Sequence, residues 1–516
     1  MFDFIASLYA PFYALSVLAL VGWIYFQDHN QSSLSQNFRR LFSLAFGTYL
    51  LSTFVADAQF GFKLGVLFRD LLVIGSLGFL FKALLHKREV FIIGSILMAA
   101  GFLWFYYAKV KTTFIEKVSV IKGLNLDKNG ELLIEIKEKA TLGKLQKTLQ
   151  KYNLRAERAF YPEKADATNL DNYYVVNIPD KFEGDIKKIE QALYKSGVVA
   201  WVEENEIVNV APIASTKPAP INNKFGINDP GLDQLWGFEA MNIDKLYNYL
   251  NTNKIKPKRK ALVAILDTGV DGKHEDLKGN FKSTKSQYDN DPVGHGTHCA
   301  GIAGAVSNNG IGVASFSTDN SYIQLTSIKV LNSYGSGTQQ SIIKGIIEAA
   351  DKGADVLSMS LGGLSDRFKI KAYEDAVKYV EKAGGIVVAA AGNSNRNAKD
   401  YSPVNTPGVI GVSAIDQDLN RAVFSNTVND IKMGVAAPGV AIYSSIPDNK
   451  YNTYNGTSMA TPYVAGLVGL LKSLNPKLTA KEAYDILNKT GKNTKATNLT
   501  GKLIQPADAV KNMIGG

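Results

Sequence analysis

The sequence has very little cysteine. Cys299 is the single cysteine among 516 residues, so no disulfide can form within the chain and the fold must rest on its apolar core, with or without a bound ion. Dense basic blocks are lacking too. The net charge is +10, but the lysines alternate with acidic residues, and only the stretch KPKRK at 256–260 is strongly basic. This pattern predicts a solvated surface and no nucleic-acid partner.

The composition changes twice along the chain, which at 516 residues is too long for one ordinary domain. The beginning is almost wholly apolar and aromatic, the middle is rich in Lys and Glu, and the remainder is rich in Gly, Ala, Ser and Asn. We therefore expect four parts: a transmembrane region at 1–110, a small domain at 111–210, a linker at 211–227 that contains three prolines, and a large domain at 228–516.

Two charge-free segments near the N-terminus, Phe4–Phe26 and Val90–Ala108, are about as long as a helix that crosses a bilayer. Segments 41–61 and 64–85 are also apolar but contain charges, so three or four spans are expected. A cleaved signal peptide fits poorly, because the first residues, MFDF, contain no base and apolar segments follow repeatedly.

With four spans, both ends of the membrane region lie on the same side. The two loops on the opposite side would contain five basic residues, and the intervening loop only Lys63 and Arg69, so the basic loops are expected in the cytoplasm and the C-terminal bulk outside. Those five residues are Arg39, Arg40, Lys82, Lys87 and Arg88. Asp57, Arg69 and Asp70 could form a functional intramembrane cluster, or lie at a boundary or pair structurally.

The middle segment, 131–206, alternates strand-like and helix-like patterns in the order βαββαβ. Apolar alternation predicts strands at ELLIEI, LRAERAFY, YYVVNI and VVAWVEEN, and helical spacing predicts helices at TLGKLQKTLQKY and GDIKKIEQALYKSG. This order describes a ferredoxin-like split unit, a fold that by itself specifies no function.

The large domain begins near Lys260 with short apolar strands that alternate with helical stretches, which indicates a doubly wound parallel sheet of the α/β class. Functional groups are expected at the carboxyl ends of such strands. Asp267 ends the first predicted strand, and Asn393 ends the strand that begins at Ile386.

Histidine is scarce as well, since the chain has five. Two of them, His295 and His298, lie in GHGTHCAGIAG at 294–304, at the start of a helix of small residues. A spacing of three could place both on a metal, but no third ligand at a matching spacing accompanies them. A general base is the better interpretation of His295, and a structural hydrogen-bonding role that of His298.

Ser458 lies in YNGTSMATPYVAGLVGLL at 454–471, where an apolar helix begins. A hydroxyl at a helix start usually caps it. Here Gly456 and Thr457 can also begin the helix, so Ser458 is available as a nucleophile at a helix end whose free N–H groups favour negative charge.

Five stretches together resemble the successive motifs of the subtilisin-like serine proteases, in that family's order of Asp, His and Ser. They are ILDTGVDGKHEDL at 265–277, GHGTHCAGIAG, SMSLGG at 358–363, AAAGN at 389–393 and NGTSMATPYVAG at 455–466. The resemblance implies that Ser458 is the nucleophile, His295 the base and Asp267 its orienting acid. It also implies that Asn393 is an oxyanion donor, and that Ser360, Leu361 and Gly362 bind the substrate backbone.

The resemblance implies three further features. SNNGIGVAS at 307–315 is similar to the family's calcium loop, with Asp276 and Asn308 as candidate ligands, although a polar turn explains it equally well and no catalytic metal is expected. Cys299 resembles the cysteine-bearing branch, or is simply a small core residue. The middle segment is similar to an inhibitory prodomain, and the mature enzyme would begin near NDPGLDQLWG at 228–237.

The sequence thus predicts a multi-pass protein of the cell membrane with an extracytoplasmic serine endopeptidase, made as a self-inhibited zymogen and acting on proteins or peptides. Two alternatives stay open. One is a catalytically silent membrane scaffold, which the intact Asp267, His295, Asn393 and Ser458 argue against. The other is a sensor whose membrane region controls the protease, for which the sequence offers no ligand site.

Overall fold

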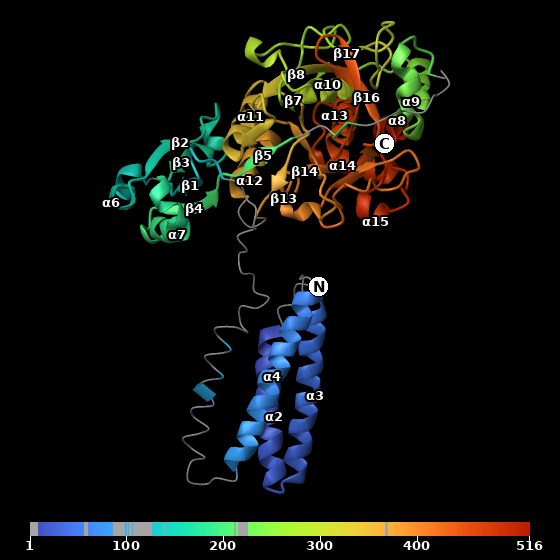
Figure 1. Ribbon diagram of the computed structural model, residues 1–516. Coiled ribbons are helices and arrows are strands. Elements are labelled where there is room, and N and C mark those ends of the chain that lie inside the picture. Colours follow the sequence, from blue (N-terminus) through green and yellow to red (C-terminus); the bar gives the residue numbers. More distant parts are fainter. Residues whose placement is uncertain are drawn as a thin grey trace. The chain divides into compact units, whose positions relative to one another are not determined.

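The computed structural model divides into two compact units, Met1–Lys122 and Gly123–Gly516 (Figure 1). The structure describes residues 9–55, 60–85, 99–100, 102, 106, 126–138, 140–210, 213–214, 225–366 and 370–515.

The described part of the first unit contains three long helices, α2 (Tyr9–Asp28), α3 (Ser32–Val55) and α4 (Phe60–Leu85). By length and composition, Tyr9–Asp28 and Lys63–Leu85 could each cross a membrane, and the first could equally be a signal sequence. The α3 helix begins with polar residues and includes Arg39 and Arg40, and it is less apolar than the other two. The predicted span Val90–Ala108 lies almost wholly outside the described residues.

One carboxylate, that of Asp70, is completely buried among these helices. It accepts hydrogen bonds from the hydroxyls of Tyr9 on α2 and Tyr49 on α3, and it pairs with Arg69 at 2.8 Å. The Tyr13 hydroxyl donates to the backbone oxygen of Asp70 at 3.2 Å. Arg69 and Asp70 therefore form a structural pair that ties α2 and α3 to α4, because a buried charge requires partners. Asp57, the third member of the predicted cluster, is outside the described residues.

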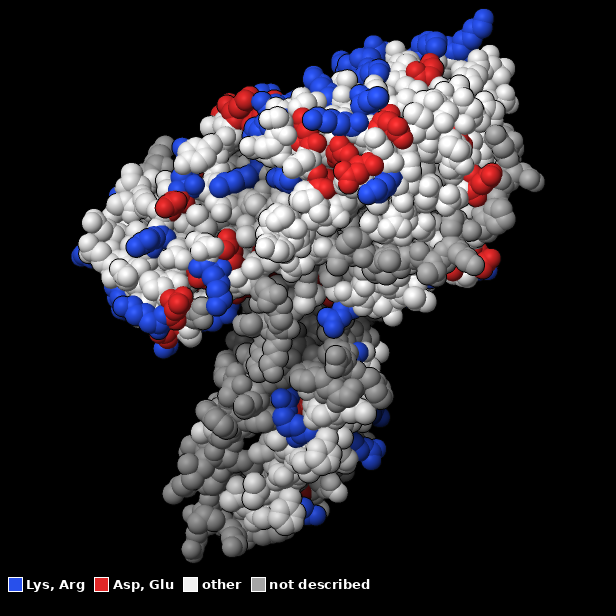
Figure 2. Space-filling model, turned by 45° about the horizontal axis from the view of Figure 1, so that its top comes forward, with Lys and Arg blue, Asp and Glu red and all other residues white. Residues whose placement is uncertain are grey.

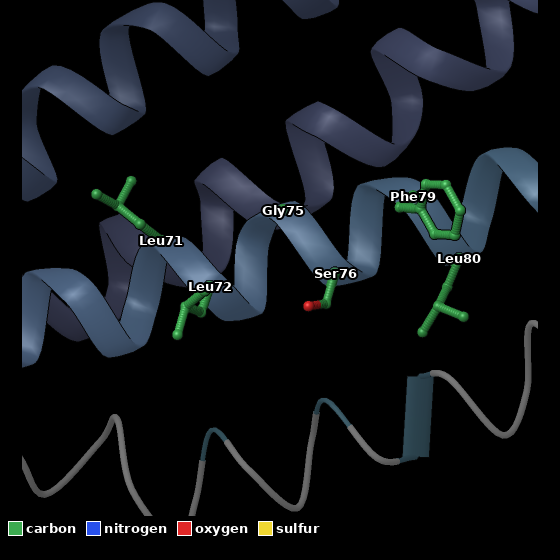
Figure 3. A pocket seen from close by; sticks show the side chains of 6 residues that line it. All are labelled: Leu71, Leu72, Gly75, Ser76, Phe79 and Leu80. Atoms are coloured by element: carbon green, nitrogen blue, oxygen red, sulfur yellow. The ribbon is translucent and has the colours of Figure 1, made fainter.

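One face of α4 exposes large apolar side chains. Figure 3 shows Leu71, Leu72, Phe79 and Leu80 projecting from this face, with the small residues Gly75 and Ser76 between them. Phe79 is 76 % exposed. An apolar surface of this kind fits contact with lipid or with another apolar segment better than contact with water.

The N-terminal part of the second unit is an antiparallel sheet with strand order β2-β3-β1-β4. The element order is βαββαβ, as the sequence predicts. Its core is formed where apolar side chains of the sheet meet Ile189 and Leu193 of the second helix. The elements are β1 (Leu132–Ile136), a 3-10 turn (Leu142–Leu145) continuing into α6 (Gln146–Lys151), β2 (Arg155–Arg158), β3 (Tyr173–Asn177), α7 (Ile186–Lys195) and β4 (Val199–Glu204).

A six-stranded parallel sheet with order β15-β14-β12-β10-β7-β8 forms the centre of the large domain. The chain passes from β7 to β8 on one side and then to β10 on the other, so the strand order reverses at β7, where ligands of such sheets bind. The strands are β7 (Ala261–Asp267), β8 (Ile323–Lys329), β10 (Val356–Met359), β12 (Ile386–Ala390), β14 (Val409–Ile415) and β15 (Gly434–Pro438).

Helices cover both faces of this sheet. Along β7, Val263 and Ile265 belong to one apolar core and Ala264 and Leu266 to the other, which explains why the strand is an unbroken apolar run. The first core includes α10 (His295–Gly304) and α13 (Thr457–Leu474), and the second includes α11 (Gln339–Asp351) and α12 (Lys371–Lys382) (Figure 1).

All 18 residues of α13 are buried. Small residues make this close packing feasible, because a Cβ added at Gly466 would lie 2.5 Å from the backbone oxygen of Ala303, and one at Gly469 would lie 2.7 Å from Val263. The rigid central helix therefore fixes the residues of its first turn, which include Ser458.

The remaining elements are shorter or peripheral. The short strands are β5 (Ile207–Asn209), β6 (Ile213–Ala214), β9 (Ser336–Thr338), β11 (Gly363–Leu364), β13 (Tyr401–Ser402), β16 (Ile442–Ile446) and β17 (Lys450–Asn455). The further helices are α8 (Trp236–Ala240), α9 (Ile243–Thr252), α14 (Ala480–Thr490), α15 (Thr497–Thr500) and α16 (Pro506–Gly515). On the face of the second unit shown in Figure 2, basic and acidic side chains are interspersed.

Candidate active site

Asp267 and His295 meet at the carboxyl end of β7. Asp267 is the last residue of that strand and His295 the first of α10, and the imidazole Nδ1 lies 2.7 Å from the carboxylate Oδ1. Both side chains are buried. Gly296 permits the approach, because a Cβ at that position would lie 2.1 Å from the carbonyl oxygen of Gly269. The backbone N–H of Thr268 also donates to Asp267 Oδ1 at 2.7 Å and fixes the carboxylate.

The environment makes His295 a stronger base. Burial lowers the pKa of the imidazole, but the charge and hydrogen bond of Asp267, together with the charge of Asp291, outweigh burial and raise that pKa above its ordinary value. With Nδ1 directed at Asp267, Nε2 is left to exchange a proton with another group.

Ser458 is the second residue of α13, where the N–H groups of the first turn have no partners within the helix. Its hydroxyl donates to the carbonyl oxygen of Ser360 at 3.0 Å, and its own carbonyl oxygen accepts from the Ser360 hydroxyl at 2.7 Å. Ser360 follows directly after β10, so these two bonds hold the start of α13 against the end of that strand.

Asn393 follows β12 and is exposed. Its side-chain oxygen accepts from the backbone N–H and the hydroxyl of Thr457, both at 2.9 Å. Because the oxygen is held in this way, the Nδ2 group is oriented as a donor beside the first turn of α13. Leu361 and Gly362, the other two predicted substrate-binding residues, follow Ser360 in the chain. Leu361 is buried and Gly362 is half-buried. Gly362 has little room for a side chain, because a Cβ there would lie 3.0 Å from the backbone oxygen of Ser402.

Residues 258–504 match a family profile described as the Subtilase family. Thermitase of Thermoactinomyces vulgaris is 44 % identical over 218 residues, which cover 41 % of this chain and 75 % of the relative. The chain belongs to the subtilase family. This subtilase is also 42 % identical to subtilisin DY of Bacillus licheniformis over 45 % of the chain and 83 % of the relative, and 32 % identical to the thermophilic serine proteinase of Bacillus sp. strain AK1 over 67 % and 78 %.

Among solved structures, a protease from Pseudoalteromonas arctica PAMC 21717 is 29 % identical, with a TM-score of 0.49, and the match covers 56 % of this chain and 99 % of that one. Family membership and the relatives make this subtilase a subtilisin-like serine endopeptidase, a hydrolase of proteins or peptides.

The second histidine of the subtilase motif has a different environment. His298 is stacked on Tyr454 with ring centroids 4.4 Å apart, and its Nε2 lies 3.1 Å from the carbonyl oxygen of Asn452. Burial lowers the pKa of His298 to about 3, so the ring is neutral. His295 and His298 have separate partners, which agrees with the structural interpretation of His298 and argues against a shared metal.

Cys299 is fully buried one turn after His295, and its thiol donates to the carbonyl oxygen of Ser458 at 3.5 Å. Burial raises the pKa of this thiol well above its ordinary value, so the reactive thiolate is disfavoured. Asp267, His295 and Cys299 are the only potential group of three metal ligands in the described part of the chain. Since two of them already form the hydrogen-bonded pair, a core role of Cys299 is the simpler interpretation.

The structure places Asp276 against the loop 307–315. One carboxylate oxygen accepts from Asn309 Nδ2 at 3.0 Å and the other from the backbone N–H of Val313 at 2.8 Å. Burial, with a further contribution from the charge of Asp229, raises the pKa of Asp276 to about 7. The side-chain oxygen of Asn308, the other candidate ligand, accepts from the backbone N–H of Asn228 at 3.2 Å.

The sequence analysis assigns no role in the site to two of its side chains. Thr457 holds the Asn393 amide, and Asp291 accepts hydrogen bonds from the first turn of α10. Thr457 was visible only as an alternative helix start. An Asp four residues before a helical histidine is a capping signal that could have identified Asp291.

Proposed function

We propose that this subtilase cleaves peptide bonds with Ser458 as the nucleophile, His295 as the general base and Asp267 as the orienting acid. The buried 2.7 Å hydrogen bond between His295 and Asp267 carries the proposal, because it leaves Nε2 as the only exchangeable nitrogen of a basic imidazole. When substrate is bound, the Ser458 hydroxyl leaves the carbonyl of Ser360 and donates to Nε2. Catalytic hydrogen bonds often form only in the substrate complex.

The reaction runs through an acyl-enzyme. As Ser458 Oγ bonds to the scissile carbonyl carbon, its proton passes to Nε2 and the carbonyl electron pair moves onto oxygen. Asn393 Nδ2 and the backbone N–H of Ser458 donate to that oxyanion, which the positive end of α13 also stabilises. His295 then gives the proton to the amine as the C–N bond breaks, which leaves the acyl-enzyme. Water next gives a proton to His295 and bonds to the acyl carbon, and the Ser458 oxygen leaves with that proton, which releases the carboxylic acid product. Ser360, Leu361 and Gly362 supply backbone groups that hold the substrate strand.

We also propose that residues 111–210 are an inhibitory prodomain. Glu203, at the end of the prodomain sheet, accepts from the backbone N–H of Ala372 at 3.2 Å and from Gln339 Nε2 at 2.9 Å. Asn205 accepts from the backbone N–H of Gln340 at 3.0 Å. The prodomain thus supplies hydrogen-bond acceptors to donors in the first turns of both α11 and α12. An ion pair between Glu135 and Lys371 at 2.6 Å adds a charged contact.

The segment after the prodomain supports self-inhibition. β5 pairs antiparallel with β9, and the N–H of Val210 donates to the oxygen of Gly335 at 2.8 Å. β6 pairs antiparallel with Tyr454 and Asn455 of β17, three residues before Ser458. The chain therefore adds strands to two elements of the enzyme, β9 and β17, in the way an extended peptide substrate binds.

Residues 1–110 are proposed to anchor the enzyme as a multi-pass membrane region of about four helices, with 228–516 as an extracytoplasmic protease domain. The apolar helices α2 and α4 support anchoring, and the exposed apolar face of α4 supports contact with lipid. The linker at 211–227 separates catalyst from membrane, so a cut there would release a soluble fragment, whereas an uncut chain would work while anchored. We favour release.

A structural calcium ion is proposed at Asp276 and the loop 307–315. The donor set fits a hard cation, because Asp229 and Asp276 are both buried carboxylates and burial, together with the charge of Asp229, raises the pKa of Asp276, so a bound cation would offset negative charge that is costly to bury. The Asn308 side-chain oxygen, which accepts one hydrogen bond from the N–H of Asn228, is a further candidate ligand. The ion would stabilise the loop and takes no part in the reaction.

The test compares wild type with Ser458→Ala in membranes that contain the full chain. A fluorophosphonate probe should label wild type and leave Ser458→Ala unlabelled, while Ser283→Ala, which changes an exposed serine, should be labelled like wild type. In wild type the C-terminal part should appear in the soluble fraction, and mass spectrometry should place its N-terminus after the prodomain. Equal labelling of Ser458→Ala would refute the triad. A labelled full-length chain confined to the membrane would refute release.

A further inference from the structure

Asp291 is a buried carboxylate to which the triad assigns no role. It is 6 % exposed, and among the described residues it accepts five hydrogen bonds, all from uncharged donors. Oδ1 accepts from the Thr268 hydroxyl at 2.8 Å and from the backbone N–H groups of Val293 at 3.1 Å and Gly294 at 2.9 Å. Oδ2 accepts from the N–H of Thr297 at 2.9 Å and its hydroxyl at 2.8 Å.

These bonds place a negative charge at the N-terminal end of α10. The residue that precedes this helix, Gly294, has φ of +87° and no side chain to cap it. Asp291, three residues before Gly294, caps the helix in its place by accepting hydrogen bonds from Thr297 in the first turn. His295 is the first residue of the same helix, where the positive end of the helix dipole disfavours a protonated imidazole. The charge of Asp291 offsets that effect at the position where the base must accept a proton.

Thr268 connects this cap to the triad. Its hydroxyl donates to Asp291 and accepts from the backbone N–H of Gly296 at 3.1 Å, and its own N–H donates to Asp267. The end of β7 and the beginning of α10 are therefore held by one continuous set of hydrogen bonds. Neither Asp267 nor His295 can shift without breaking part of it.

Charged and titratable groups face His295 and Asp291 from β7, from the loop before α10, from α10 itself and from β17, where burial and the charge of Asp291 contribute to the raised pKa of Tyr454. Asp267 faces the imidazole from the end of β7, and Asp291 from the loop before α10. On α10 itself, His298 is neutral and the Cys299 thiol is protonated. The charge of Asp291 contributes to the raised pKa of His295 in addition to that of Asp267.

We propose that Asp291 is a positioning residue of the peptidase reaction, which caps the helix of His295 and favours the protonated imidazole that forms during turnover. The inference rests on the proposed function of His295. When Ser458 Oγ bonds to the carbonyl carbon, its proton moves to Nε2, and Asp291 stabilises the positive charge so formed. The charge disappears again when Nε2 gives the proton to the leaving amine. Asp291 itself exchanges no proton and touches no substrate.

The test is the pH profile of kcat/KM of the full-length enzyme with a chromogenic peptide in Asp291→Asn. The variant is isosteric but removes the charge, and its amide nitrogen cannot accept the hydrogen bonds that one carboxylate oxygen accepts, so His295 should lose its proton at lower pH. The acid limb should shift down by about half a pH unit, the size expected for a charge at a helix terminus. kcat should fall and KM should change little, because the stabilised charge exists only during turnover.

Asp271→Asn is the matched control. Asp271 also accepts two backbone N–H bonds nearby, from Lys273 at 3.1 Å and Asp448 at 3.1 Å, but it does not cap α10, so its acid limb should coincide with that of wild type. If Asp291→Asn does not fold, Asp291→Ser, another neutral cap, gives the same readout. An unshifted limb in the folded neutral variant overturns the inference, even if kcat falls. Failure of the triad would appear separately, as active Ser458→Ala.

Discussion

The contact of Glu203 with the protease predicts that the prodomain is held more weakly as pH rises. Its carboxylate is completely buried between the first turns of α11 and α12. Burial raises the pKa of Glu203 to about 8, although the hydrogen bonds from Trp201 and Ala372 act in the opposite direction. Burial likewise raises the pKa of Glu206 to about 8.

The sign and size follow from linkage. A solvated glutamate in the undocked prodomain has its ordinary pKa of 4.5, so docking takes up a proton between pH 4.5 and about 8. Docking is strongest below the lower value and is progressively lost as pH rises to the upper one. Within this window each pH unit weakens docking by up to about tenfold for each of the two glutamates. Gln resembles the protonated side chain of Glu203. Because Glu203 is one of the two glutamates, Glu203→Gln should remove about half of the change with pH in the logarithm of the docking equilibrium constant.

The assay uses Ser458→Ala as the background, so that the chain cannot cleave itself. Undocking is measured as the rate at which added trypsin cuts within 126–210 at pH 6 and pH 8, relative to Glu157→Gln. Glu157 lies on an exposed edge strand of the same sheet and serves as the matched control. The ratio of rates between the two pH values should be at least about tenfold smaller in Glu203→Gln. The same ratio in Glu203→Gln and Glu157→Gln would refute the reasoning.

Two further predictions concern the oxyanion and the ion. Asn393→Ala should lower kcat by roughly 100- to 1,000-fold with little change in KM, because its amide meets charge that develops only in the transition state, and a change confined to KM would contradict that role. Removal of calcium by a chelator should lower the thermal midpoint of the full-length protein, since an ion that binds only the folded state stabilises it. Asp276→Asn should abolish this difference, and a chelator effect that persists in Asp276→Asn would place the ion elsewhere.

The fold and the candidate active-site residues Asp267, His295 and Ser458 were predictable because the relevant sequence signals are local. The strand that ends at Asp267 is an unbroken apolar run, and the residues around His295 and Ser458 form helix starts with small neighbours. The βαββαβ order followed in the same way from alternation and helical spacing. Apolar helices were also evident in the first unit, where two helices of the described part are apolar and long enough to be candidate spans and the predicted span Val90–Ala108 lies almost wholly outside the described residues.

The sequence by itself determined which residues could perform the chemistry, since hydrophobic periodicity sets each strand and helix and a motif fixes the residue at its end. Only the tertiary structure decided which backbone groups those residues meet. The Ser458 hydroxyl bonds to the carbonyl of Ser360, and Asp291 and Thr268 join two elements through a single hydroxyl. Asn308 meets Asn228, and Glu203 lies between two helix ends. Most of these contacts involve backbone carbonyl and N–H groups, which nearly every residue carries, so no residue pattern identifies them, and the packing of distant segments selects the pairs.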